Sequence, residues 1–447
     1  MLPRLDYRTF QGGAAMTLTA DQVRKHLLSM FDSLLKRRDE FLINPASDFT
    51  RKKKISFAQT MLFPMVAGAD NTATELLDIF GENDLPLPSA MIQRRNQVKK
   101  EAFMELFYQF QKVIPILNRF HGYQLVACDG SRLNLPYNPA DHVTHTKSME
   151  GRKGINQVHM NALYDLLNDI FLDVEIQGMQ EMDEQAALSG LLDKHYISAV
   201  KRIYLADRGY ASFNIFAHAI HNNQKFVIRM KECNAKALCP DNPHLLDDPR
   251  VDETIIVHIG RNRKEASYQN ENYHYVRSTH RYDFVEPGSE IIDRLQFRIL
   301  KFPLGNGVYE YIATNLPREQ FSINTIKELY NLRWGEETAF RHLKYAGNMV
   351  HIHSLKWDFL IQEIYGKLTM YNFSSCIEKT ISKKDKLTSK HIYVFNHTQM
   401  QKFVRLFLIG AICSLEVLIK KFMVPVRPGR KFNRIIRRQS AEPLSYR

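Results

Sequence analysis

The stretch that decides the fold and the chemistry of this chain is YNLRWGEETAFRHLK, residues 330–344. A helix turns by about 100° per residue, so four of these side chains share a stripe roughly 60° wide, namely Tyr330, Arg333, Glu337 and Lys344. Arg341 lies at the edge of the stripe. One face therefore carries a carboxylate, an aromatic hydroxyl and three cations, which suits a site where a metal ion meets a phosphodiester. A charged solvent-exposed face with an intrahelical ion pair is the alternative.

Two carboxylates upstream of this stretch stand where apolar strands are expected to end. Residues 123–128 are a run of strand formers that leads into Asp129, and residues 199–206 lead into Asp207 in the same way. Each motif alone also fits an ordinary turn. Together with a helical glutamate, carboxylates at two strand ends can hold two divalent cations. That geometry activates a water or a hydroxyl and stabilises the leaving oxygen in phosphoryl transfer.

The spacing Tyr-x2-Arg-x3-Glu-x6-Lys in residues 330–344 resembles the signature of the insertion-sequence-four group of DDE transposases, which are bacterial cut-and-paste enzymes. The segments Asp129-Gly130-Ser131 and Asp207-Arg208-Gly209-Tyr210 resemble the first and second catalytic motifs of the same family, in the same order. The resemblance covers about residues 85–435, most of the chain.

This resemblance implies roles for single residues. Asp129, Asp207 and Glu337 would be the catalytic acids and the ligands of two Mg²⁺ ions, with Mn²⁺ able to substitute. DNA contacts near the cleaved phosphate would come from the rest of the stripe, namely Tyr330, Arg333 and Lys344, joined by Arg341 at its edge. Glu336 is a rival to Glu337, but it lies about 100° further round the helix and off the stripe. For Trp334, within the same motif, packing inside the protein is at least as good an expectation as a DNA contact.

The implied function is that of a DNA transposase. It would bind the terminal inverted repeats of an insertion sequence, cleave the ends by metal-dependent phosphodiester hydrolysis and join the 3′-OH ends to target DNA. Its partners would be double-stranded DNA and a second subunit in a paired-end complex, and the resemblance also implies a DNA hairpin intermediate. Two alternatives stay open: a catalytically inactive, transposase-derived DNA-binding protein, and an RNase H-like nuclease that cuts without joining. A basic RNA-binding scaffold fits least, because the sequence has no RNA-recognition motif.

The composition favours a polyanionic partner. The 447 residues carry a formal net charge of +13 with a pI of about 9.3, and nucleic acid is the first expectation for such a chain. A membrane is not expected, because the most apolar stretch, residues 406–415, is too short to span a bilayer. Five scattered cysteines without zinc-ligand spacing, and no signal-peptide order at the start, favour a reduced cytoplasmic compartment. The family resemblance implies that this is a bacterial-type cytoplasm, with the protein associated with the nucleoid. Met16 is an alternative start.

The chain is too long for one compact core, so several modules are expected. The predicted fold class is α/β, with an RNase H-like catalytic core, a mostly β insertion between the second aspartate and the catalytic glutamate, and helical N- and C-terminal regions. The expected boundaries are 1–118 for a helical DNA-binding region, 119–231 for the first part of the core, 232–320 for the insertion, 321–355 for the second part of the core with the glutamate helix, and 356–447 for the helical C-terminal region with a basic tail.

Basic side chains outside the stripe suggest further DNA contacts. A helix expected to begin near Ser89 carries Arg94, Arg95, Lys99 and Lys100. Guanidinium groups can read base edges and lysines can meet phosphates, so this helix suits a DNA groove, with a charged solvent face as the alternative. The insertion carries four basic residues, Arg261, Arg263, Lys264 and Arg277. They either line DNA or keep an edge-rich sheet soluble.

Overall fold

The computed structural model describes residues 11–12, 18–51, 53–147, 154–195, 200–238, 247–263, 272–381 and 393–425. A ten-stranded mixed sheet runs through its centre in the order β10-β9-β11-β12-β8-β7-β3-β5-β4, with β6 also paired to β5. The strands are β3 (Gln124–Leu135), β4 (His145–Thr146), β5 (Ile155–Asp165), β6 (Ile170–Gly178), β7 (Arg202–Ala206), β8 (Lys225–Met230), β9 (Val251–Gly260), β10 (Tyr273–Tyr275), β11 (Asp293–Gly305) and β12 (Val308–Thr314).

Five strands at the middle of the sheet form the catalytic-core arrangement. β5 runs antiparallel to β3 and β6, whereas β7 and β8 run parallel to β3 and are reached through helices α7 (Glu184–Lys194) and α8 (Phe213–His221). β7 and β8 are short and mostly buried, as strands covered on both faces must be. The order β6-β5-β3-β7-β8 is that of an RNase H-like core, and the predicted α/β class is confirmed.

The tight turn between β5 and β6 shows how local chemistry fixes this core. Asp165 is completely buried at the turn, and its Oδ1 accepts hydrogen bonds from the backbone amides of Leu167 and Asn168, each at 3.0 Å. Asp169 has a φ of 53°, a left-handed conformation that a short polar side chain tolerates. The turn thereby sets the register between β5, which pairs with β3, and β6.

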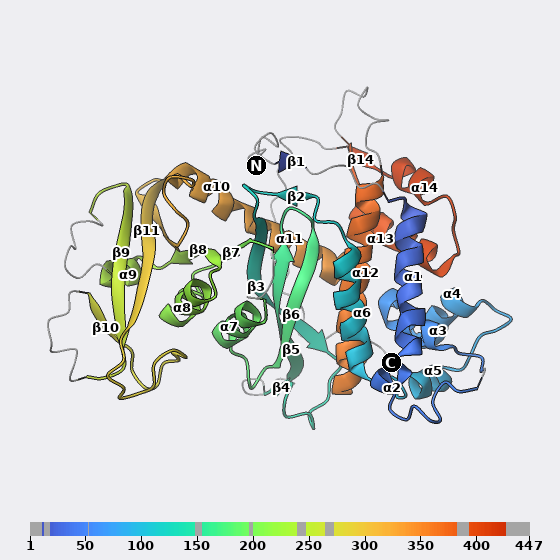
Figure 1. Cartoon of the computed structure of the whole chain (residues 1–447). Coiled ribbons are helices and arrows are strands. Elements are labelled where there is room, and N and C mark those ends of the chain that lie inside the picture. Colours follow the sequence, from blue (N-terminus) through green and yellow to red (C-terminus); the bar gives the residue numbers. More distant parts are fainter. Residues whose placement is uncertain are drawn as a thin grey trace.

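The strands of the predicted insertion are present, and they extend the central sheet. β12 pairs antiparallel with β8, and β11 and β9 follow outward, with β10 at the edge. Helix α9 (Glu232–Ala237) lies between β8 and β9 in the chain. Figure 1 shows these strands at one end of the molecule and the helices of the two chain ends at the other. The insertion thus shares its backbone hydrogen bonding with the core.

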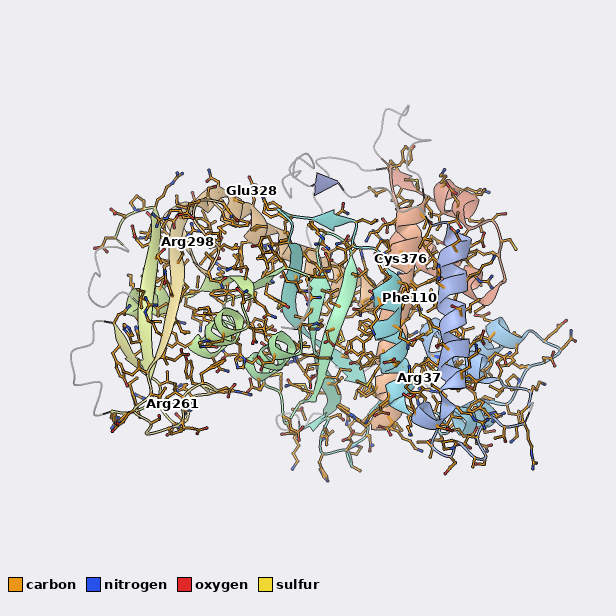
Figure 2. All side chains as sticks on the ribbon, in the orientation of Figure 1. Arg37, Phe110, Arg261, Arg298, Glu328 and Cys376 are labelled. Atoms are coloured by element: carbon orange, nitrogen blue, oxygen red, sulfur yellow. The ribbon has the colours of Figure 1, made fainter. Side chains whose placement is uncertain are left out.

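Helices from the two ends of the chain pack together beside the core (Figure 1). The N-terminal helices are α1 (Ala20–Lys36), α2 (Arg38–Phe41), α3 (Phe57–Val66), α4 (Thr72–Phe80), α5 (Pro88–Arg95) and α6 (Lys100–Val113), and the C-terminal ones are α12 (Trp357–Thr380), α13 (His397–Ile409) and α14 (Leu415–Lys421). α12 is buried along most of its length, against α6, α3 and β6. Phe110 of α6 and Cys376 of α12 mark this interface in Figure 2. The ring centroids of Phe110 and Phe373 of α12 lie 6.2 Å apart.

Two short strand pairs complete the described chain. β1 (Gln11–Gly12) pairs with β2 (Asn118–Arg119), and β13 (Tyr393–Val394) pairs with β14 (Val424–Pro425). The predicted basic tail after residue 425 lies outside the described residues. Within the described part of the chain, none of the helices combines the length and the apolar character that a bilayer crossing requires.

Candidate functional site

Asp129 lies on β3, and Asp207 directly follows the neighbouring parallel strand β7. Cys128 of β3 is paired with Ala206 of β7, so the residues that follow them, Asp129 and Asp207, emerge side by side. β3 does not end at Asp129 as predicted, because it continues to Leu135 in antiparallel pairing with β5. Asp207 does follow the last residue of β7, and its Oδ1 accepts the amide of Gly209 at 2.7 Å.

The glutamate stretch is helical throughout, but it is not one regular helix. α10 (Ile323–Leu332) and α11 (Trp334–Arg341) meet at Arg333, whose φ of −49° and ψ of −34° keep the chain helical. The π-helical turn η4 (His342–Ala346) follows and contains Lys344. The predicted stripe assumed α-helical spacing to its end, whereas Lys344 lies in a wider π-helical turn.

Arg333 joins two of the three predicted acids. Its Nη1 lies 3.8 Å from Asp129 Oδ2, and its Nη2 donates to Glu337 Oε1 at 3.3 Å. Burial raises the pKa of Asp129 to about 6; the Gly130 amide and Arg333 oppose this rise, while the charges of Asp207 and Glu337 add to it. The three carboxylates are therefore close enough for their charges to interact.

These carboxylates have the donor chemistry that Mg²⁺ or Mn²⁺ requires, since both are hard cations that prefer oxygen ligands. Among the described residues, however, no three His, Cys, Asp or Glu side chains are grouped closely enough to hold a metal ion. The Arg333 guanidinium lies between two of the acids and provides the positive charge. The carboxylate oxygens suit Mg²⁺ or Mn²⁺, but the three acids would have to move closer together to bind such an ion.

Glu336 and Glu337 have opposite environments. The Glu337 side chain is 41% exposed on the side of Arg333, whereas Glu336 is completely buried and neither of its carboxylate oxygens has a hydrogen-bond partner among the described residues. Burial, followed by the charge of Asp129, raises the pKa of Glu336 well above its usual value. Glu337 is thus the acid that faces outward, and Glu336 lies behind it.

Tyr330 does not occupy the position predicted for a DNA contact. It is 3% exposed and belongs to an apolar cluster between α10 and the sheet, because the register of α10 turns it inward. Its ring lies 5.8 Å below the Arg333 guanidinium, so it supports Arg333. Trp334 differs from expectation in the opposite sense, since it is 48% exposed. The sequence pattern could not show that Tyr330 faces inward and Trp334 outward, because the sheet that covers α10 comes from distant segments of the chain.

The remaining cations of the stripe differ in exposure. Arg341 is exposed at the end of α11. Lys344 is half-buried, and burial lowers its pKa. Arg333 is itself only 6% exposed, and its Nε has no hydrogen-bond partner among the described residues. Arg341 is therefore the most accessible of these cations, whereas Arg333 is placed to act on a group that enters the site.

The predicted groove-reading helix has an internal structural role. Arg95 is buried and pairs with Glu363 of α12 at 3.3 Å, and Arg94, also buried, lies over the Phe49 ring at 4.4 Å. Lys99 Nζ donates to a backbone carbonyl of α2, and Lys100 pairs with Asp358 at 2.9 Å. The helix also breaks after α5, before α6 begins. These contacts correct the predicted DNA-contact role of Arg94 and Arg95, which are buried, whereas DNA contact through the partly exposed Lys99 and Lys100 stays a prediction.

The basic residues of the insertion also divide. Arg261 is buried, and its guanidinium donates to five backbone carbonyls, which closes the loop that follows β10. Arg263 lies over the Tyr275 ring at 5.8 Å, and Arg277 is exposed. Lys264 lies outside the described residues. Of the three that the structure describes, Arg263 and Arg277 are exposed and remain available to DNA.

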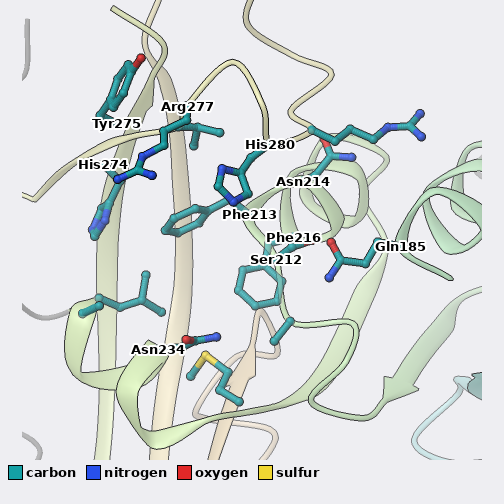
Figure 3. A pocket seen from close by; sticks show the side chains of 16 residues that line it. Gln185, Ser212, Phe213, Asn214, Phe216, Asn234, His274, Tyr275, Arg277 and His280 are labelled. Atoms are coloured by element: carbon teal, nitrogen blue, oxygen red, sulfur yellow. The ribbon is translucent and has the colours of Figure 1, made fainter. Parts of the chain in front are cut away.

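A cavity of about 400 Å³ that the sequence did not predict lies between α8 and the insertion. Figure 3 shows Phe213, His274 and His280 around it, with Arg277 and Gln185 also at its wall. Gln185 Nε2 donates to the Gly209 carbonyl at 2.9 Å, which connects the cavity wall to the Asp207 turn. Its lining comes from four separate segments, and no local pattern could have identified it.

A family model described as "Transposase DDE domain" matches residues 120–373. The chain is also similar to a cryo-EM structure of a piggyBac transposase synaptic complex with hairpin DNA, with 7% sequence identity, 92% of this chain and 83% of that chain covered, and a TM-score of 0.47. No curated protein sequence matches the chain.

Proposed function

The chain belongs to the family of transposase DDE domains, because residues 120–373 make up more than half of its length, and from this membership we propose that it is a metal-dependent DNA transposase. Membership implies an enzyme that cleaves and transfers DNA. The insertion-sequence-four group is the proposed subgroup, on the Tyr-x2-Arg-x3-Glu-x6-Lys spacing of residues 330–344.

The proposal is carried by two acids, Asp129 and Glu337, that share the Arg333 guanidinium, with Asp207 next to Asp129 at the end of the neighbouring strand. Asp129 and Asp207 emerge from paired parallel strands, and Glu337 is brought to Asp129 through Arg333. Burial raises the pKa of Asp129, and the nearby charges of Asp207 and Glu337 add to this rise. Such an arrangement is typical of a site that gains a cation when it works.

Asp129, Asp207 and Glu337 would hold the divalent cations, with Mg²⁺ expected and Mn²⁺ as the substitute. When bound, two such ions lower the pKa of an attacking water and stabilise the departing 3′ oxygen. Arg333 would place positive charge beside the reacting phosphodiester, in a site where burial makes that charge worth more than in water. Tyr330 would fix the orientation of Arg333 from below, and exposed Trp334 and Arg341 would meet the DNA.

The proposed sequence of events is cut-and-paste transposition. The protein would bind the terminal inverted repeats of its element, hydrolyse one strand at each end and join the freed 3′-OH to target DNA, with two subunits holding the paired ends. A hairpin intermediate would fit the same site, because each step is an in-line phosphoryl transfer.

The cavity beside Gln185 offers aromatic and cationic side chains on which an unpaired nucleotide could stack. The expected compartment is the bacterial-type cytoplasm.

A strand-cleavage assay on the DNA that flanks the gene tests this proposal. With Mg²⁺ or Mn²⁺, wild-type protein is expected to nick at the element boundaries. Glu337→Gln is expected to lower the cleavage rate by roughly 100-fold or more, because loss of a residue that only orients a metal ligand already costs about 10–100-fold. The matched variant Glu336→Gln, one residue away and buried, is expected to retain most of the rate.

The outcomes separate the competing functions. Equal losses in the two variants would mean that the acid has been misassigned. Binding to the ends without cleavage, in either metal, would favour an inactive DNA-binding descendant of a transposase. Cleavage without any joining of the 3′-OH to target DNA would favour an RNase H-like nuclease.

A further inference from the structure

The first turn of α7 lies against both aspartate-bearing segments. We propose that Glu184 and Gln185 of this turn, together with His159 of β5, are positioning residues. They would set the spacing between Asp129 and Asp207 for cation binding. This inference rests on the proposed function and deepens it. The residues concerned contact the glycines that follow each aspartate, and none of them belongs to the Tyr-Arg-Glu-Lys spacing.

His159 fills the space beside the first aspartate. A Cβ added to Gly130 would collide with the His159 imidazole and would lie 3.1 Å from Glu184 Oε1. The His159 side chain is 4% exposed, and its Nε2 lies 3.0 Å from Glu184 Oε1. Glycine at position 130 is therefore required by this ring, which packs directly against the strand that carries Asp129.

The same helical turn holds the second aspartate. Gln185 Nε2 donates to the Gly209 carbonyl at 2.9 Å, and the Gly209 amide donates to Asp207 Oδ1 at 2.7 Å. A Cβ added to Gly209 would lie 3.0 Å from Asp207 Oδ1 and 3.9 Å from Glu184 Oε2. Glu184 therefore lies between the two glycines, with one carboxylate oxygen directed toward each.

This turn is anchored independently of the aspartates. Asp183 caps α7 by accepting the Ala186 amide at 2.9 Å, and its own amide and carbonyl are both bonded to the Gln177 side chain at the end of β6. Because its base is fixed to the sheet, the turn can transmit a rigid spacing to the loops it touches. Glu184 also carries the charge that a helix N-terminus favours.

The competing explanation is that Glu184 only stabilises the helix start. The two explanations differ in what they predict for cation affinity. A helix-stabilising carboxylate should change the melting temperature and leave cation binding alone. Residues that orient ligands should change cation affinity roughly 10-fold or more, as outer-shell partners in metal sites do.

The test is Mn²⁺ binding to the full-length protein, measured by electron paramagnetic resonance of the free ion, with thermal melting recorded for each variant. Glu184→Gln is expected to weaken Mn²⁺ binding roughly 10-fold, and the exposed Glu181→Gln on the preceding loop is the matched control. In cleavage assays the Mn²⁺ midpoint should shift for Glu184→Gln while the rate at saturating Mn²⁺ stays close to wild type. Unchanged Mn²⁺ affinity with a changed melting temperature would overturn the inference.

Two further variants keep the test decisive. Asp129→Asn should abolish tight Mn²⁺ binding, and if it does not, the proposed ligand set is wrong. If Asp129→Asn loses Mn²⁺ binding while Glu184→Gln keeps wild-type affinity, only the positioning role of Glu184 is rejected. If Glu184→Gln folds poorly, Gly130→Ala should weaken Mn²⁺ binding by displacing the ring. Wild-type Mn²⁺ affinity in a folded Gly130→Ala protein would overturn the inference.

Discussion

Arg333 holds together charges that would otherwise repel. Its guanidinium contacts Asp129 and Glu337 from a position that is itself nearly buried, over the Tyr330 ring. The spacing in the sequence predicted that Arg333 and Glu337 would share a helical face, since they are one turn apart. It could not predict that Tyr330 faces inward, because that depends on which sheet surface covers α10.

Asp129 should make the metal-free protein less stable at neutral pH than at acid pH. Its pKa is raised from 3.8 to about 6, so the folded state holds this proton more tightly than the unfolded state does. The stabilisation from the bound proton is complete below the usual value and is lost as pH rises through about 6. Asp129→Asn, which cannot ionise, should therefore be more stable than wild type above pH 6, by up to about 3 kcal/mol.

Thermal melting with EDTA between pH 4 and 8 measures this difference. The gain in Asp129→Asn should shrink toward pH 4, and added Mn²⁺ should stabilise the wild type but not the variant. A constant difference at all pH values would mean that the effect comes from packing instead of ionisation.

Among the elements, local patterns located the strands and the helical glutamate segment, and tertiary contacts decided the rest. The apolar run that leads into Asp207 ends where β7 ends, because a short buried strand appears in the sequence as consecutive apolar residues. β3 continues past Asp129 because β5 pairs with it over that length, which is information held elsewhere in the chain. The same holds for the basic residues of α5, whose partner α12 is more than 250 residues away in the sequence.

The ion pair between α5 and α12 should be essential to stability and irrelevant to DNA contact. Arg95 is buried, pairs with Glu363 at 3.3 Å and also donates to Gln362 and the Phe359 carbonyl. Arg95→Ala should lower the free energy of unfolding by about 3–5 kcal/mol, because it leaves a buried carboxylate without its partner.

Denaturant unfolding measures that loss, and end-DNA binding by the folded fraction should be unchanged. Arg95→Met combined with Glu363→Leu should be less destabilising than Arg95→Ala, since no buried charge is left alone. A selective loss of DNA binding in Arg95→Ala, with stability intact, would restore the groove-reading role.

At the scale of the whole molecule, the modules expected from sequence are not separate bodies in space. The insertion strands continue the core sheet through the β8–β12 pairing. One apolar cluster includes residues of α1, α3, α6, α12 and the sheet. Composition and charge could predict that the chain has several regions, but a sequence pattern cannot tell whether neighbouring regions share a core.

Removing residues 1–118 should therefore unfold the rest instead of freeing an active catalytic part. α12 is buried along most of its length, and α3 and α6 cover much of it. Without them, a fragment of residues 119–447 would expose a long apolar helix face to water, which costs roughly 25 cal/mol per Å². The fragment is expected to aggregate or to melt without cooperativity, and co-expression with residues 1–118 should rescue its solubility. A fragment that melts cooperatively near the wild-type temperature would show that the N-terminal helices form an independent domain, as the sequence alone suggests.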